Sequence, residues 1–143
     1  MPEYLFVYGT LRPACAPSAL QPLLAKWRPS GAGSVVGTLY DLGEYPGAVL
    51  LPTGESRVFG DVFELADAAA AFLALDEYEG FIAEQPAASL FLRTRCEVTL
   101  ADDRRLSAWI YVYNQSLATA TQIPSGDYLR NCVKQNPSNR RNG

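Results

Sequence analysis

Two carboxylates near the end of an alanine-rich segment have the residue type and spacing for proton chemistry. If the segment from Asp67 to about Tyr78 forms a helix, as its alanine run predicts, Glu79 falls four residues after Leu75. Asp76 has the same spacing from Phe72. A carboxylate on an apolar helix face is costly unless it is paired, protonated or functional. Both remain candidates, as does the plainer interpretation that the helix ends early and Glu79 is solvated.

A glycine-containing loop follows the first apolar run. Tyr4 to Tyr8 is typical of a buried strand, and the chain then continues as Tyr8-Gly9-Thr10-Leu11-Arg12. Glycine lets a backbone approach a ligand closely and leaves N–H groups that can face an anion or a carbonyl oxygen. An ordinary turn at the end of a strand has the same pattern, so spacing alone leaves both interpretations open.

The chain contains no histidine, which narrows the possible chemistry. A Ser-His-Asp triad, a Cys-His pair and a histidine-ligated metal site are excluded. Cys15, Cys96 and Cys132 are odd in number and far apart, so they indicate reduced thiols and not a zinc site or a disulfide framework. We therefore expect no metal, and any proton transfer must use carboxylates, tyrosines, lysines or thiols.

Length and charge limit the classes of partner. The 143 residues suit one domain, which we expect over residues 1–134, with a flexible tail over 135–143. The net charge of −3 provides no field that would attract nucleic acid or an anionic membrane. No apolar run approaches the roughly 20 residues of a membrane span, and Met1-Pro2-Glu3 lacks the basic start of a signal peptide. We expect a cytoplasmic protein.

The remaining pattern predicts several strands and few helices. Clean alternation over Leu92–Leu100, a turn, and a return over Leu106–Tyr113 indicate a hairpin. Such a pattern is typical of an α+β domain with a largely antiparallel or mixed curved sheet. The other expected elements are strands over Val35–Tyr40, Ala48–Leu51 and Arg57–Leu65, a short helix from Ser18 to Trp27 closed by Pro29 and Gly31, and a final helix over Asp127–Val133.

Five segments, taken together in order, are more specific than any one of them. They are Phe6-Val7-Tyr8-Gly9-Thr10-Leu11-Arg12, Gly37-Thr38-Leu39-Tyr40-Asp41-Leu42-Gly43 with Tyr45-Pro46-Gly47-Ala48, Val58-Phe59-Gly60-Asp61-Val62-Phe63-Glu64, Leu75-Asp76-Glu77-Tyr78-Glu79-Gly80, and Ala108-Trp109-Ile110-Tyr111-Val112-Tyr113. From about Tyr4 to Tyr113, the chain resembles the gamma-glutamylcyclotransferase-like family, including its AIG2-like and gamma-glutamylamine cyclotransferase branches.

The resemblance implies a fold, a reaction and a site. The fold is a small mixed β-barrel flanked by short helices, with a cavity at one end. The reaction releases 5-oxoproline and a free amine from a small-molecule γ-glutamyl substrate, and it needs no metal or organic cofactor. Glu79 is the implied acid/base, and the loop from Tyr8 to Arg12 holds the γ-glutamyl group, largely through backbone amides. Tyr45 and Tyr113 are further substrate-binding candidates, although a turn for Tyr45 and core packing for Tyr113 are the simpler explanations.

The chain departs from the family pattern in two places. Pro13–Ser18 replaces the Gly, Asn and His that many relatives carry after the loop arginine. Phe91, two residues before Arg93, stands where many relatives have a tyrosine. Both changes leave the identity of the substrate open. Two alternatives stay open: a γ-glutamyl deprotecting or acyl-transfer enzyme acting on a larger amine, and a barrel that binds a small molecule without chemistry.

Overall fold

The first apolar run forms β1 (Tyr4–Val7), which lies in the middle of the sheet. It pairs antiparallel with β4 (Arg57–Glu64) and parallel with β6 (Arg105–Tyr113). Leu5 and Val7 pack in one hydrophobic cluster, whereas Phe6 and Tyr8 pack in another. Because both faces of β1 are buried, its sequence is continuously apolar instead of alternating.

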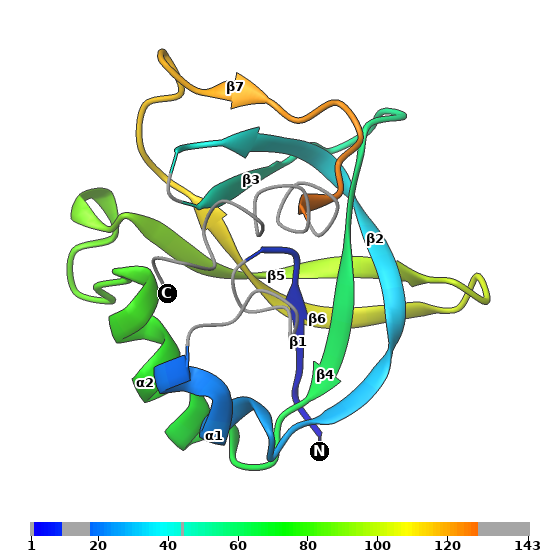
Figure 1. Cartoon of the computed structure of the whole chain (residues 1–143), viewed down its shortest axis with the longest axis vertical. Coiled ribbons are helices and arrows are strands. Elements are labelled where there is room, and N and C mark those ends of the chain that lie inside the picture. The colour runs from blue at the N-terminus through cyan, green and yellow to red at the C-terminus, as the bar shows by residue number, and fades with distance from the viewer. Residues whose placement is uncertain (1, 10–17, 44, 129–143) are drawn as a thin grey trace.

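A long strand, β2 (Arg28–Asp41), closes the sheet into a barrel. In the computed structural model, which describes residues 2–9, 18–43 and 45–128, β2 pairs with β4 along one edge and with β5 (Phe91–Leu100) along the other. The order β2–β4–β1–β6–β5 thus returns to β2, a closed ring of strands that can be followed in Figure 1. The parallel β1–β6 pair among antiparallel neighbours makes the barrel mixed, as expected.

Two short strands extend β2 beyond the ring. β3 (Pro46–Leu50) pairs with residues 37–41 of β2, and β7 (Thr121–Gln122) pairs with Tyr40 and Asp41. The predicted hairpin is confirmed, since β5 and β6 pair from Phe91↔Tyr113 to Thr99↔Arg105. A 3-10 turn, η2 (Pro86–Ala88), precedes β5.

The hydrophobic residues form two clusters that alternate along the strands. One cluster includes Phe6, Val35, Val62 and Ile110. The other covers the opposite face of β1 and β6 and is completed by the helices α1 (Gln21–Leu24) and α2 (Ala68–Glu79). Figure 1 shows both helices on the same side of the barrel. The α+β architecture with a small mixed barrel and flanking helices is therefore confirmed.

The first helix is shorter than expected. The segment forms one 3-10 turn, η1 (Ser18–Leu20), and then the four residues of α1. Pro29 and Gly31, which were expected to close the helix, lie inside β2, at a shift in its register with β4. A helix this short gains few hydrogen bonds, so pairing with β4 determines the structure from Arg28 onward.

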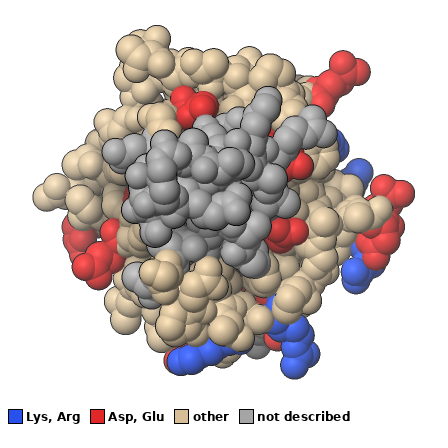
Figure 2. All heavy atoms as spheres, viewed as in Figure 1, with Lys and Arg blue, Asp and Glu red and all other residues tan. Residues whose placement is uncertain are grey.

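Several predictions concern residues outside the described ranges. They include Thr10, Leu11, Arg12, Cys15, Cys132, the tail over 135–143 and most of the helix expected over 127–133. Among the described residues, no helix has both the length and the apolar character needed to cross a membrane. On the face drawn in Figure 2, the basic side chains of the described residues stand in separate small groups near the edge.

Candidate active site

Glu79 is the last residue of α2, and the two ends of that helix explain its position. Asp67 caps the first turn by accepting a hydrogen bond from the backbone N–H of Ala70. Gly80 ends the helix in the left-handed conformation, with φ of 71°. The N–H of Phe81 donates to the carbonyl of Asp76, and that of Gly80 to the carbonyl of Glu77. This pair of hydrogen bonds is a Schellman motif, in which the residue after the helix adopts a left-handed conformation that glycine takes without steric cost.

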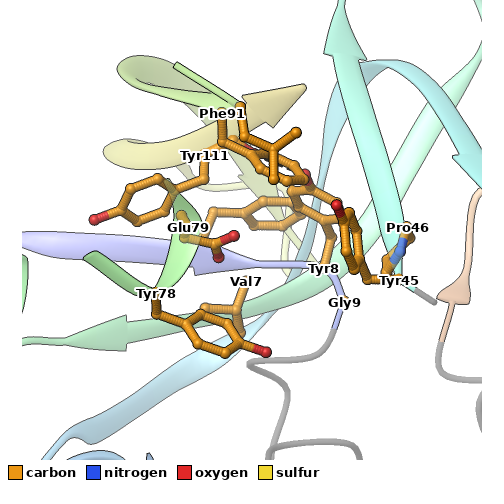
Figure 3. Close-up of a pocket in the computed structure, with 11 residues that line it drawn as sticks. Val7, Tyr8, Gly9, Tyr45, Pro46, Tyr78, Glu79, Phe91 and Tyr111 are labelled. Atoms are coloured by element: carbon orange, nitrogen blue, oxygen red, sulfur yellow. Dashed lines mark hydrogen bonds between the residues drawn. The ribbon is translucent and has the colours of Figure 1, made fainter. Parts of the chain in front are cut away.

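The Glu79 carboxyl group faces a pocket of about 140 Å³ at the end of β1 (Figure 3). One buried water needs roughly a tenth of that volume, so the pocket can accept a small organic group. Its walls come from β1, the β2–β3 loop, α2 and strands β5 and β6. The lining residues are Phe6, Val7, Tyr8, Gly9, Tyr45, Pro46, Tyr78, Glu79, Leu90, Phe91 and Tyr111.

Burial raises the pKa of Glu79 to about 8. The side chain is half-buried and lines the pocket, where aromatic rings replace most of the water that would solvate a charge. The carboxyl end of a helix also disfavours a negative charge. A carboxyl with this pKa exchanges protons near neutral pH, which is the property required of a general acid/base.

Tyr8 forms part of the pocket wall through its ring, but its hydroxyl is fully engaged. The hydroxyl donates to the carbonyl of Tyr111 at 2.7 Å and accepts from the backbone N–H of Ala48 at 3.1 Å. Burial, with a smaller contribution from the charge of Glu79, raises the pKa of Tyr8 far above its ordinary value. Tyr8 therefore stays neutral and links β1, β3 and β6 through its hydroxyl, and it does not serve as an acid in proton transfer.

The structure separates the two carboxylates that spacing nominated together. Asp76 binds the guanidinium of Arg93 through two hydrogen bonds and accepts a third from the hydroxyl of Tyr111. It is absent from the described pocket lining, which Glu79 joins. Asp76 is thus paired with a cation. The described residues that line the pocket around Glu79 include no cation that would offset the cost of burying its charge.

The expected substrate-binding residues fall into three groups. Tyr8, Gly9 and Tyr45 line the pocket beside Glu79. Thr10, Leu11 and Arg12 lie outside the described residues. Tyr113 does not line the pocket; its ring packs against Phe91, with the ring centres 5.4 Å apart.

The sequence alone does not assign several of the lining residues to the pocket, among them Tyr78, Leu90, Phe91 and Tyr111. Tyr78 is adjacent to Glu79, and this adjacency was the available signal. Leu90 is brought in by backbone hydrogen bonds, since its N–H donates to the carbonyl of Gly80 and its carbonyl accepts from the N–H of Asn114. Phe91 was singled out for its residue type, and the structure places that ring against Tyr45 in the pocket wall.

The raised pKa of Glu79 predicts a pH-dependent stability. Between about pH 4.3, where an unfolded glutamate titrates, and about pH 8, the folded protein retains a proton that the unfolded chain has lost. The contribution of Glu79 to the free energy of unfolding should therefore fall as the pH rises through this window and should level off above about pH 8. Glu79→Gln cannot titrate at this position, so its stability relative to the wild type should rise as the pH increases. Urea midpoints of both proteins across this range test the prediction, and parallel pH curves would contradict it.

Comparisons with known proteins agree with this fold. A family model described as gamma-glutamyl cyclotransferase, AIG2-like, matches residues 5–130. No curated protein sequence matches the chain. Similar solved structures include YkqA of Bacillus subtilis, which is 26% identical with a TM-score of 0.67. The match covers 98% of this chain but only 43% of YkqA, so this chain spans less than half the length of YkqA. YtfP of Escherichia coli is 29% identical over 90% of this chain and 97% of its own, with a TM-score of 0.61. An AIG2-like protein of Mus musculus is 22% identical over 78% of this chain and 76% of its own, with a TM-score of 0.59.

Proposed function

The chain belongs to the AIG2-like gamma-glutamyl cyclotransferase family, and from that premise we propose that it releases 5-oxoproline and a free amine from a γ-glutamyl amine or peptide. The main support for the proposal is the position and pKa of Glu79. Among the described lining residues it is the one carboxyl group, and burial raises its pKa to about 8. Glu79 is the proposed general acid/base.

The reaction suits a site with a single proton carrier. The α-amino nitrogen of the glutamyl unit attacks its own γ-carbonyl carbon, a five-membered ring closes, and the bond to the leaving amine breaks. Ring closure is intramolecular, so the effective concentration of the nucleophile is already high. Glu79 takes a proton from the attacking nitrogen and returns it to the leaving nitrogen. An α-ammonium with a pKa of about 8 and a carboxyl with a pKa of about 8 are well matched for this transfer.

Binding of the γ-glutamyl group is assigned to the loop that begins at Tyr8 and Gly9. We propose that backbone N–H groups from this loop, continuing through Thr10, Leu11 and Arg12, face the α-carboxylate and the γ-carbonyl oxygen. Each donor aimed at the developing oxyanion can contribute roughly 3 kcal/mol to the transition state. Tyr45 and Phe91 supply an apolar wall beside this loop.

Gly9→Ala tests the loop, because the added methyl group has no space. A Cβ atom on Gly9 would lie 2.5 Å from Cγ of Pro46, and both residues line the pocket. Such overpacking typically costs about 1–3 kcal/mol. We expect kcat/KM for a γ-glutamyl substrate to fall about tenfold or more, mainly through a higher KM. An unchanged kcat/KM in a variant with a normal unfolding midpoint would show that Gly9 is not part of the binding site.

A substrate panel tests the function itself. Purified protein would be incubated with γ-glutamyl dipeptides, γ-glutamyl-ε-lysine and simple γ-glutamyl amines, and 5-oxoproline and free amine would be quantified together. The proposal predicts equal amounts of the two products from at least one compound. Calorimetric binding of the same compounds distinguishes the alternative, since tight binding without either product would identify a ligand-binding barrel.

A further inference from the structure

Two donors from neighbouring strands meet on one carboxylate behind the pocket. Asp76 accepts at Oδ1 from the Tyr111 hydroxyl at 2.6 Å and from Arg93 Nε at 2.9 Å, and at Oδ2 from Arg93 Nη2 at 3.2 Å. Arg93 and Tyr111 are register partners on β5 and β6. Hydrogen bonds that involve charged groups are shorter and stronger than neutral ones. The last turn of α2 is therefore fastened to two strands at a single residue.

The same carboxylate belongs to the residue that closes the helix. The backbone carbonyl of Asp76 accepts the N–H of Phe81 in the Schellman motif, and Glu79 lies between these two residues in the chain. Asp76 is thus held at its side chain by the sheet and at its backbone by the turn that carries Glu79. A shift of Asp76 would move Glu79 with it.

Tyr111 extends the connection to the opposite wall of the pocket. Its ring lines the pocket, and Figure 3 shows its hydroxyl directed away from the pocket. That hydroxyl donates to Asp76. The backbone carbonyl of Tyr111 accepts the hydroxyl of Tyr8, which accepts in turn the N–H of Ala48. The bonds therefore run from α2 through β6 to Tyr8, directly after β1, and to the middle of β3.

Arg93 is itself confined by packing. Its guanidinium carbon lies 4.1 Å from the ring centre of Phe72 and 5.0 Å from that of Trp109. These stacking contacts favour the orientation in which the planar group forks onto Asp76. The cation is thus supported by packing as well as paired.

We propose that Asp76, Arg93 and Tyr111 are positioning residues that hold the last turn of α2 so that the Glu79 carboxyl stays aligned with the reacting nitrogen atoms. This inference rests on the proposed function of Glu79. Catalytic groups must be held within roughly 0.5 Å of the productive geometry. A displacement of about 1 Å can cost on the order of a hundredfold in rate.

Tyr111→Phe is the sharpest variant, because it removes one oxygen atom and keeps the ring that lines the pocket. We expect kcat for a γ-glutamyl substrate to fall roughly ten- to a hundredfold, while KM changes less than about twofold. Asp76→Asn should have a similar effect. Since the residues act as a unit, kcat of the double variant should be little lower than kcat of the less active single variant. Tyr4→Phe, which removes a hydroxyl from the start of β1, is the matched control and should keep wild-type kinetics.

A second readout does not depend on turnover. The Glu79 carboxyl carbon would be titrated by NMR in the wild type, Tyr111→Phe and Tyr4→Phe. Release of the helix end should expose the carboxyl to water and lower its pKa from about 8 toward that of an ordinary glutamate in Tyr111→Phe alone. If no protein turns over any substrate, the proposed function fails, but the titration still decides the positioning role. An unchanged kcat in an active enzyme, or an unchanged Glu79 titration in folded Tyr111→Phe, would overturn the inference.

Discussion

Glu79→Gln is expected to lower kcat for a γ-glutamyl substrate by roughly 10²–10⁴-fold, the usual contribution of a positioned general acid/base. Glutamine keeps the size of the side chain and can still donate a hydrogen bond into the pocket. It cannot take a proton from the attacking nitrogen or return one to the leaving amine. KM should change little, because the loss concerns the transition state and not ground-state binding.

Glu77→Gln is the matched control for this experiment. Glu77 lies two residues earlier on the same helix, is exposed and is not among the described residues that line the pocket. The substitution makes the same chemical change at a different point of the helix surface, so kcat should stay within about twofold of the wild type. Equal activities for the two variants would show that the Glu79 carboxyl has no role in proton transfer.

Leu75→Ala is expected to give the largest loss of stability. Leu75 is 0% exposed and belongs to the cluster that joins α2 to β1 and β6. Removal of a fully buried leucine side chain costs about 2–5 kcal/mol, because the transfer free energy is lost and a cavity remains. For a chain of this size, that loss lowers Tm by on the order of 10 °C. Thermal and urea unfolding measure the effect.

Leu73→Ala is the control for Leu75→Ala on the same helix. Leu73 is 77% exposed, so the same truncation should change the free energy of unfolding by less than about 0.5 kcal/mol. A similar loss in both variants would mean that α2 is not packed on the barrel through the face that contains Leu75. Because Glu79 is four residues beyond Leu75, Leu75→Ala should also reduce activity at temperatures where the variant is still folded.

The strand β1 and the helix α2 show how far the sequence predicts the fold. The continuous apolar run of β1 predicted a buried strand, since only a strand buried on both faces avoids polar residues throughout. The alanine run predicts a helix from Asp67 to about Tyr78, which agrees with α2 nearly to its ends. Closure of the barrel was expected from the family resemblance and not from periodicity, because the β2–β5 pairing joins residues far apart in the chain.

The candidate site could be predicted only in part. Helical spacing places Asp76 and Glu79 equally close to the apolar face, and it does not reveal that Asp76 is the one that pairs with Arg93. That pairing depends on the register of β5 against the helix, which local sequence does not encode. The direction of the Tyr111 hydroxyl is similarly a tertiary feature, since the alternation in β6 gives the face of a side chain but not its partner.

In the proposed reaction the substrate's own amino group closes the ring, and turnover of a γ-glutamyl amine in H₂¹⁸O tests this step most directly. Cyclisation breaks the γ-amide bond without water, so the protein should release 5-oxoproline that contains no ¹⁸O, together with an equal amount of free amine. Release of glutamate carrying ¹⁸O in its γ-carboxylate would show hydrolysis instead and would rule out cyclisation.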